Sequence, residues 1–193
     1  MAKARFFYAL RPDPEAADAL AALAARVAAR WGGHAFAADD IHLTLAFVGM
    51  RALDEQPALA AILQGLAPRV APAPPLALSR LGSFGHGVLW LAPPPQARND
   101  ATFAHALAHE IRRRLGAARI DFDARPLKLH ATLVRGARNF GADEATTGTD
   151  DGLLAPEPIV AREWSLALGA GLPNPSDGRR YRWWTPAGPP VTA

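Results

Sequence analysis

The feature that most constrains this chain is a short pattern, His-x-Thr-Leu, that occurs twice. The first copy lies in Ile41–Gly49 (IHLTLAFVG) and the second in Leu129–Arg135 (LHATLVR). Both segments are apolar and rich in strand-forming residues, so each is predicted to be a β-strand, the first ending at Gly49. Side chains alternate between the two faces of a strand. The His and Thr of each copy therefore share one face, and the apolar residues beside them share the opposite face and point into a core.

The residue types of this repeated pattern indicate chemistry on an anion. The chain has six histidines, and two of them, His42 and His130, stand in the pattern. Two imidazoles that face one cleft can act as a general acid and a general base. The hydroxyls of Thr44 and Thr132 can donate hydrogen bonds to the oxygens of an anion. One copy alone would more often be an ordinary half-buried pair, but two copies on two strands favour phosphoryl transfer, which depends on positioning and charge stabilisation.

The segments around the two copies follow one plan, which predicts a duplicated unit. Each half has a strand, a turn marked by proline, a helix and a strand with the pattern, and the two histidines are 88 residues apart (130 − 42). The expected elements are the strand Arg5–Leu10, the helix Ala16–Trp31 capped by Asp13, the strand with His42, the strand Val88–Leu91, a helix from Asn99 or Asp100 to about Leu115, and the strand with His130. Two related lobes around a pseudo-twofold axis would bring the motifs face to face.

The remaining segments are predicted to complete this arrangement. We expect a helix over 54–66, strands over 76–81, 159–168 and 179–184, a turn over 82–87, a surface loop over 139–157 and a frayed tail from 186. The whole chain, residues 1–193, is expected to form a single domain of two related lobes with one His-x-Thr motif each.

Composition excludes several classes of protein. The chain has no cysteine, which excludes disulfides, thiolate metal sites and cysteine nucleophiles. No segment approaches the ~20 apolar residues of a membrane span, and the amino end lacks the apolar region of a signal peptide. We therefore expect a cytoplasmic enzyme. The net charge of +3 is compatible with a polyanionic substrate but does not require one.

Two other polar groups are predicted to be solvated faces of the helix that ends near Leu115. His105 and His109 have the i, i+4 spacing of a metal-binding pair, but the sequence offers no third ligand. Arg112–Arg114 is expected to be a solvated basic run.

The paired motifs, with Arg135 closing HATLVR and the strand RFFYAL near the amino end, resemble the 2H phosphoesterase superfamily. Within it the chain is similar to the RNA 2′,3′-cyclic phosphodiesterases, also called 2′–5′ RNA ligases, from Arg5 to about Tyr181. The resemblance implies a bilobal α+β fold in which two antiparallel sheets line a central cleft with helices outside. It also implies hydrolysis of RNA 2′,3′-cyclic phosphate ends to 2′-phosphates, a reaction that the same groups could reverse as 2′–5′ ligation.

Residue roles follow from the resemblance for five positions. His42 is expected to be the acid and His130 the base, while Thr44, Thr132 and Arg135 hold the phosphate. The pseudo-symmetry leaves the opposite order of acid and base open. One position departs from the family pattern, because Leu129 stands where members commonly have proline before the second histidine.

Two further residues are candidates for substrate binding. Phe47 lies five residues after His42, where the family often has an aromatic that stacks on a base. Strand alternation points both Phe47 and Arg135 away from the histidine face, so a bulge or a strand end must intervene if they reach the cleft. Otherwise Phe47 belongs to the core and Arg135 to the rim. Lys128 lies two residues before His130. If the strand already includes Lys128, the two side chains share one face; otherwise Lys128 is an exposed lysine at the start of the strand.

These residues require no metal and no cofactor, and we expect a monomer that acts on RNA ends or cyclic nucleotides. Two alternatives remain open at this point: another 2H activity on small cyclic nucleotides, and a nucleotide-binding module that does not turn over.

Overall fold

The computed structural model describes residues 2–66, 74–95, 100–138, 140, 157–171 and 180–185, and its fold is α+β. The strands are β1 (Lys3–Pro12), β2 (His34–Ala35), β3 (Leu43–Ala52), β4 (Leu76–Leu78), β5 (Arg80–Ser83), β6 (Leu89–Ala92), β7 (Ala131–Arg135), β8 (Ile159–Ala161), β9 (Trp164–Gly171) and β10 (Tyr181–Trp184). The α-helices are α1 (Pro14–Trp31), α2 (Gln56–Ala61) and α3 (Thr102–Ala117), with short 3₁₀ helices at Ala38–Asp40 and Leu53–Glu55.

One large antiparallel sheet dominates the molecule. Seven of its eight strands follow the order β10-β9-β1-β3-β7-β6-β5, β2 pairs with β7, and β4 and β8 form a separate two-stranded sheet. Each half of the large sheet contains a strand, a helix and a motif strand, namely β1-α1-β3 and β6-α3-β7, and in each half the two strands pair with each other. The halves join at one residue pair, Leu43 with Ala131. The fold class predicted from the sequence is therefore confirmed. The two antiparallel halves, expected as two sheets, are joined edge to edge in one large sheet.

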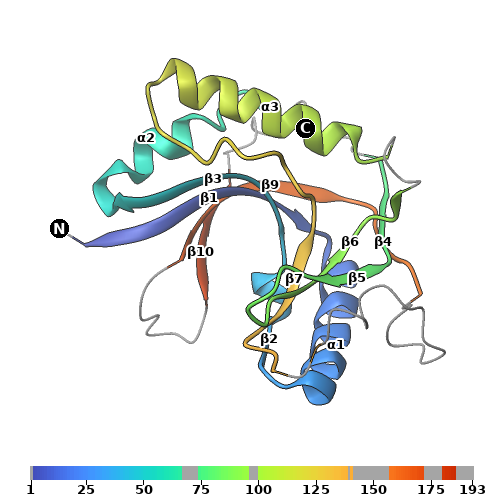
Figure 1. The fold of residues 1–193 in the computed structure, drawn as a ribbon. Coiled ribbons are helices and arrows are strands. Elements are labelled where there is room, and N and C mark those ends of the chain that lie inside the picture. Colours follow the sequence, from blue (N-terminus) through green and yellow to red (C-terminus); the bar gives the residue numbers. More distant parts are fainter. Residues whose placement is uncertain are drawn as a thin grey trace.

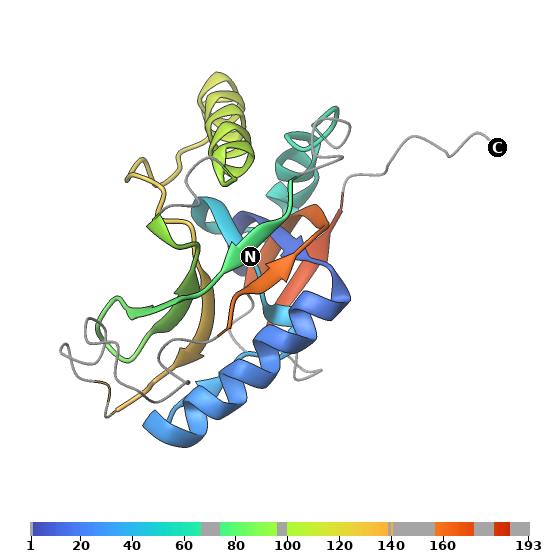
Figure 2. The same ribbon diagram turned by 90° about the vertical axis from the view of Figure 1, so that its right-hand side faces the viewer.

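Each long helix packs on the motif strand of the other half. α1 connects β1 to β3 but contacts β7 and β8, whereas α3 connects β6 to β7 but contacts β3. Figure 1 shows α2 and α3 over one side of β1, β3 and β9, and α1 beside β2 and β7. In Figure 2, α1 (blue) and α3 (yellow-green) lie at opposite ends of the molecule. Because each helix packs on the other half, the two halves share one hydrophobic core, to which both helices contribute buried leucines.

The predicted cap of the first helix is confirmed. The Asp13 Oδ1 accepts a hydrogen bond from the Ala16 amide at 2.9 Å, and its Oδ2 accepts one from the Arg162 amide at 2.8 Å. These bonds hold the pKa of Asp13 below its ordinary value. One carboxylate therefore begins α1 and also fixes the connection between β8 and β9.

Several element boundaries differ from the prediction. Gly49 does not end its strand, because it adopts a φ of +91° that glycine tolerates and β3 continues to Ala52. The helix expected over 54–66 is a 3₁₀ turn followed by α2, which ends at Ala61. Asp100 does not cap α3, whose N-cap is Ala101, and Asn99 lies outside the described residues, as do most of the expected surface loop and the tail.

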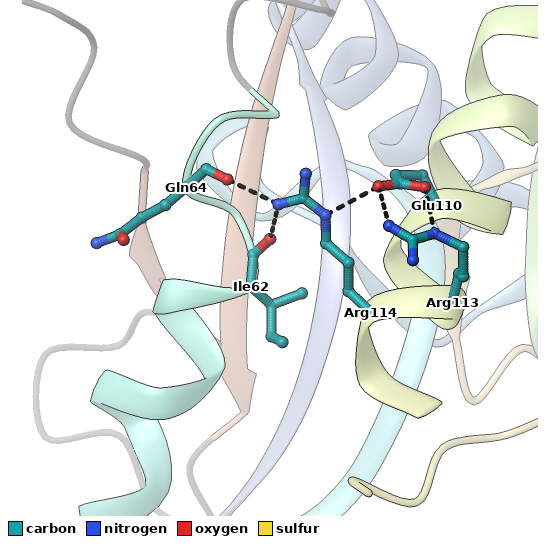
Figure 3. A network of polar contacts seen from close by, with 5 residues as sticks. All are labelled: Ile62, Gln64, Glu110, Arg113 and Arg114. Atoms are coloured by element: carbon teal, nitrogen blue, oxygen red, sulfur yellow. Dashed lines mark hydrogen bonds and ion pairs between the residues drawn. The ribbon is translucent and has the colours of Figure 1, made fainter. Parts of the chain in front are cut away.

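The basic run on α3 is not uniformly solvated. Arg114 donates hydrogen bonds through Nη1 to the carbonyl oxygens of Ile62 (3.0 Å) and Gln64 (2.7 Å), and through Nε to Glu110 (3.0 Å). Figure 3 shows this network, in which Glu110 also binds the more exposed Arg113. Arg114 thus connects the end of α3 to the turn after α2. None of the described helices is long and apolar enough to cross a membrane.

Candidate active site

The two motifs meet at one pocket with a volume of about 400 Å³. The residues predicted from the sequence that line it are His42, Thr44, Phe47, His130, Thr132 and Arg135. The other lining residues are Arg5, Phe7, Met50, Gly171, Arg180 and Tyr181. The apolar residues that alternate with the motif residues, Leu43, Leu45, Ala131 and Leu133, are almost completely buried on the opposite face. Strand alternation therefore divides each motif into a core face and a pocket face, as predicted.

Both histidines are held by the same local hydrogen bond. The Nδ1 of His42 lies 2.7 Å from the carbonyl oxygen of Asp40, and the Nδ1 of His130 lies 2.6 Å from that of Lys128. A carbonyl oxygen only accepts, so each Nδ1 carries the proton and donates it. This leaves each Nε2 as the nitrogen that can exchange a proton. The second histidine makes this contact with Leu129 in the place of the family's proline, so its local geometry matches that of the first.

A bulge in each motif strand brings the fifth residue after the histidine back to the pocket face. Leu45 is an extra residue of β3, because its two neighbours pair with consecutive residues of β1. Leu133 is an extra residue of β7 in the same way, against β6. One extra residue shifts the alternation of side chains by one position. A bulge, one of the two expected ways for Phe47 and Arg135 to reach the cleft, is thus present in both copies, three residues after each histidine.

Aromatic rings enclose His42. Phe7 stacks on its imidazole with ring centroids 4.8 Å apart. Tyr181 and Trp183, both on β10, meet the same ring edge-on at 5.1 and 5.2 Å. His42 is only 8% exposed as a result. Burial also raises the pKa of the Tyr181 phenol, which keeps its hydroxyl protonated and able to donate a hydrogen bond.

Burial sets the proton affinity of both histidines. It lowers the pKa of His42 to about 4, and the nearby charges of His130 and Arg135 act in the same direction. Burial, followed by the charge of Arg135, also lowers the pKa of His130. Burial therefore favours the neutral form of both imidazoles at pH 7. A bound anion would raise both pKa values, because a negative charge stabilises the imidazolium form.

Three arginines line the pocket, of which the sequence predicted only Arg135. Arg5 lies over the ring of Phe47, with its guanidinium carbon 5.9 Å from the centroid. Arg180 lies 4.6 Å from the centroid of Phe36. Arg5 could have been found from alternation along RFFYAL, which places it with Phe7 on one face of β1. Arg180 belongs to a distant segment whose pairing leaves no signal in the sequence.

Lys128 does not line this pocket. β7 begins at Ala131, so strand alternation does not extend back to Lys128. Its Nζ lies 5.9 Å from the centroid of Phe84, in hollows that adjoin the pocket at His130. The pair His105 and His109 is exposed on α3. Among the described residues, no group of three or more His, Asp or Glu is placed to hold a metal ion.

Comparisons with known proteins give a consistent family. The sequence profile of the 2'-5' RNA ligase superfamily matches residues 10–161. E. coli LigT in complex with 3'-AMP is 21% identical, with a TM-score of 0.57 over 96% of this chain and 95% of LigT. TT0787 of Thermus thermophilus is 24% identical, with a TM-score of 0.59 over 94% of each chain.

A protein described as a phosphoesterase is 26% identical, with a TM-score of 0.54 over 94% of this chain and 98% of its own. No curated protein sequence matches the chain. The structural neighbours share the fold, and the profile spans both His-x-Thr motifs and the strands that carry them. The chain belongs to the 2'-5' RNA ligase superfamily.

Proposed function

We propose that this protein hydrolyses the 2′,3′-cyclic phosphate ends of RNA to 2′-phosphates. The observation that carries the proposal is the matched pair of histidines in one pocket, each with Nδ1 bound to a backbone carbonyl and Nε2 available for proton transfer. Membership of the superfamily supports it as well. The pocket volume of about 400 Å³ suits a nucleotide, since ligand pockets generally measure ~300–1,000 Å³.

In the proposed reaction one histidine takes a proton from water, and the water oxygen attacks the phosphorus. The bond from phosphorus to the ribose O3′ breaks, and the other histidine gives a proton to that oxygen. The hydroxyls of Thr44 and Thr132 and the guanidinium of Arg135 hold the non-bridging oxygens. If a 5′-hydroxyl takes the place of water, the same groups form a 2′–5′ linkage: the hydroxyl oxygen attacks the phosphorus, the bond to O3′ breaks, and the two histidines again accept and donate the two protons. None of these steps requires a metal ion or a cofactor, and we propose that the protein works as a cytoplasmic monomer.

The order of acid and base is a separate part of the proposal. The order expected above has His42 as the acid, whereas the strongly lowered pKa of His42 favours the reverse order. The pH profiles of the single variants distinguish the two. A variant without the base loses the acidic limb of the profile, and a variant without the acid loses the basic limb.

Product analysis with an oligoribonucleotide that ends in a 2′,3′-cyclic phosphate tests the proposal. We expect a 2′-phosphate end, identified by chromatography against 2′- and 3′-phosphate standards. His42→Ala and His130→Ala should abolish most of the product. His109→Ala, which removes an exposed histidine of α3, is the matched control. A 3′-phosphate product, or no product, would contradict the proposal.

Two other functions give different outcomes in the same assay. Activity on 2′,3′-cyclic mononucleotides without activity on RNA ends would indicate an enzyme that acts on small cyclic nucleotides. The pocket of about 400 Å³ is large enough for such a substrate. Tight binding of nucleotides without any product would indicate a binding module.

A further inference from the structure

A second hollow adjoins the pocket at His130. Its volume is about 610 Å³, and it shares Thr44, Phe47 and His130 with the first pocket. Phe84 and Lys128 also line it, and the proposed mechanism uses neither side chain. The size of this hollow is sufficient for a second nucleotide.

Phe84 presents an aromatic ring that core packing does not explain. It lies in the turn between β5 and β6 and is 43% exposed. Its ring meets the imidazole of His130 edge-on, with centroids 4.6 Å apart, and tilts against Trp90 at 5.1 Å. Among the described residues only Met50, Phe84 and Val160 are large hydrophobic side chains that are exposed, and the first two line these adjoining hollows. Exposed aromatic surface beside a polar site is typical of a binding surface.

The turn that carries Phe84 is held by backbone hydrogen bonds. The Phe84 amide donates to the carbonyl oxygen of Val88 at 3.2 Å, and the Ala137 amide donates to that of Gly87 at 3.1 Å. Gly87 has a φ of +71° and packs so closely against Ala137 that a Cβ would not fit. The ring is therefore positioned before any ligand binds, which reduces the entropy cost of binding.

Lys128 supplies a cation over the face of this ring. Its Nζ lies 5.9 Å from the Phe84 centroid, and the structure gives it no ion pair with any residue in the described ranges. The neighbouring Arg125, by contrast, is paired with Asp123. An aromatic face beside an unpaired cation matches the two parts of a nucleotide, because bases stack on aromatic rings and phosphates attract cations.

We propose that Phe84 and Lys128 form a second nucleotide subsite, in which Phe84 stacks on a base and Lys128 binds its phosphate. This inference rests on the proposed function, because it extends the same substrate beyond the nucleotide that carries the reacting phosphate. A cyclic-phosphate end has a neighbour only on its 5′ side, so the occupant is the penultimate nucleotide of the strand. The preferred substrate is then an oligonucleotide, not a cyclic mononucleotide.

Binding of reaction products tests the subsite without requiring turnover. Calorimetry would compare a dinucleotide and a mononucleotide that both end in a 2′-phosphate, and the quantity of interest is the ratio of their affinities. In Phe84→Ala this ratio should fall by about tenfold, the usual worth of one base stacked on an aromatic ring. Phe84→Trp should preserve the ratio, and Lys128→Gln should lower it and flatten its dependence on salt.

Matched controls lie away from both hollows. Val160→Ala removes an exposed hydrophobic side chain with the same exposed fraction as Phe84, and Lys3→Gln removes the only other lysine. Both should leave the affinity ratio unchanged. A ratio that stays the same in Phe84→Ala, or that changes equally in Val160→Ala, would overturn the subsite.

The same variants separate this inference from the proposed function. Hydrolysis of cyclic phosphate ends with no affinity advantage for the dinucleotide would refute the subsite alone. A dinucleotide advantage that depends on Phe84, in a protein that does not hydrolyse these ends, would refute the reaction and keep the subsite. A dependence on Phe84 seen only with a 2′–5′-linked dinucleotide that lacks a terminal phosphate, so that the linkage itself holds the reacting phosphate, would overturn the assignment to the penultimate nucleotide.

Discussion

The burial of His42 predicts that the protein loses stability in mild acid. Its pKa is lowered from 6.5 to about 4 in the folded state, mainly because the surrounding aromatic rings exclude water from the imidazole. Between these two values the unfolded chain binds a proton that folded His42 does not bind. The free energy of unfolding therefore decreases as the pH falls from above 6.5 towards 4.

The size of this effect follows from the two pKa values. A shift of one pKa unit corresponds to 1.36 kcal/mol, so the full shift of His42 corresponds to about 3 kcal/mol at pH 4. At pH 5, where the unfolded state is already protonated, the loss relative to pH 8 is about 2 kcal/mol. His130 acts in the same direction, because its pKa is also lowered. The carboxylates with lowered pKa values, such as Asp13 and Glu110, have ordinary values of 3.8 and 4.5, so their contribution to stability is lost mainly below pH 5.

Urea denaturation at pH 8 and pH 5, followed by tryptophan fluorescence, measures the effect. His42→Asn keeps an amide donor near the carbonyl of Asp40 but removes the titrating group, so it should lose about 2 kcal/mol less between the two pH values than the wild type. His109→Asn, which changes an exposed histidine, is the control and should behave like the wild type. Equal losses in the wild type and in His42→Asn would refute the argument from burial.

The remaining predictions concern catalysis and the packing of α3. His42→Ala and His130→Ala should each lower kcat by roughly 10²–10⁴, and the double variant should be little worse because the two groups act together. EDTA should leave turnover unchanged, and loss of activity that one divalent ion restores would contradict the mechanism. Arg135→Lys should raise KM roughly tenfold, since lysine cannot bind a phosphate in a bidentate manner. Arg114→Ala should lower the free energy of unfolding by about 1–3 kcal/mol without changing kcat, because it removes bonds to two backbone carbonyls; the more exposed Arg113→Ala should leave stability unchanged.

The sequence predicts the parts of the site that depend on local periodicity. Strand alternation correctly placed the His and Thr of each motif on one face and the leucines on the other. It also showed that Phe47 could reach the pocket only through a bulge or a strand end, but not which of the two occurs, because the extra residue is visible only against the partner strand. The cap at Asp13 was predictable for the same local reason, whereas its second bond to Arg162 was not.

What the sequence could not show depends on contacts between distant segments. Tyr181 and Trp183 cover His42 only because β10 pairs with β9, and β9 in turn with β1. Arg114 was predicted to be solvated because its carbonyl partners lie about 50 residues away, on the turn after α2. Alternation could place Lys128 on the face of His130 only if the strand reached it, and β7 begins three residues later, at Ala131. Periodicity carries no information about such pairings.

The two halves are alike in their motifs and differ in what covers them. Both histidines share the same Nδ1 bond and the same bulge three residues later, so the motifs themselves hold the two rings alike. The strand β10 breaks this equality, because it lies beyond β9 at one end of the sheet, and the opposite end stops at β5. Its Tyr181 and Trp183 exclude water from His42, whereas the exposed turn at Phe84 leaves His130 more open. An acid and a base must hold their protons differently, so the catalytic asymmetry that we propose arises from the residues around each motif: Phe7, Tyr181 and Trp183 enclose His42, and Phe84 lies beside His130.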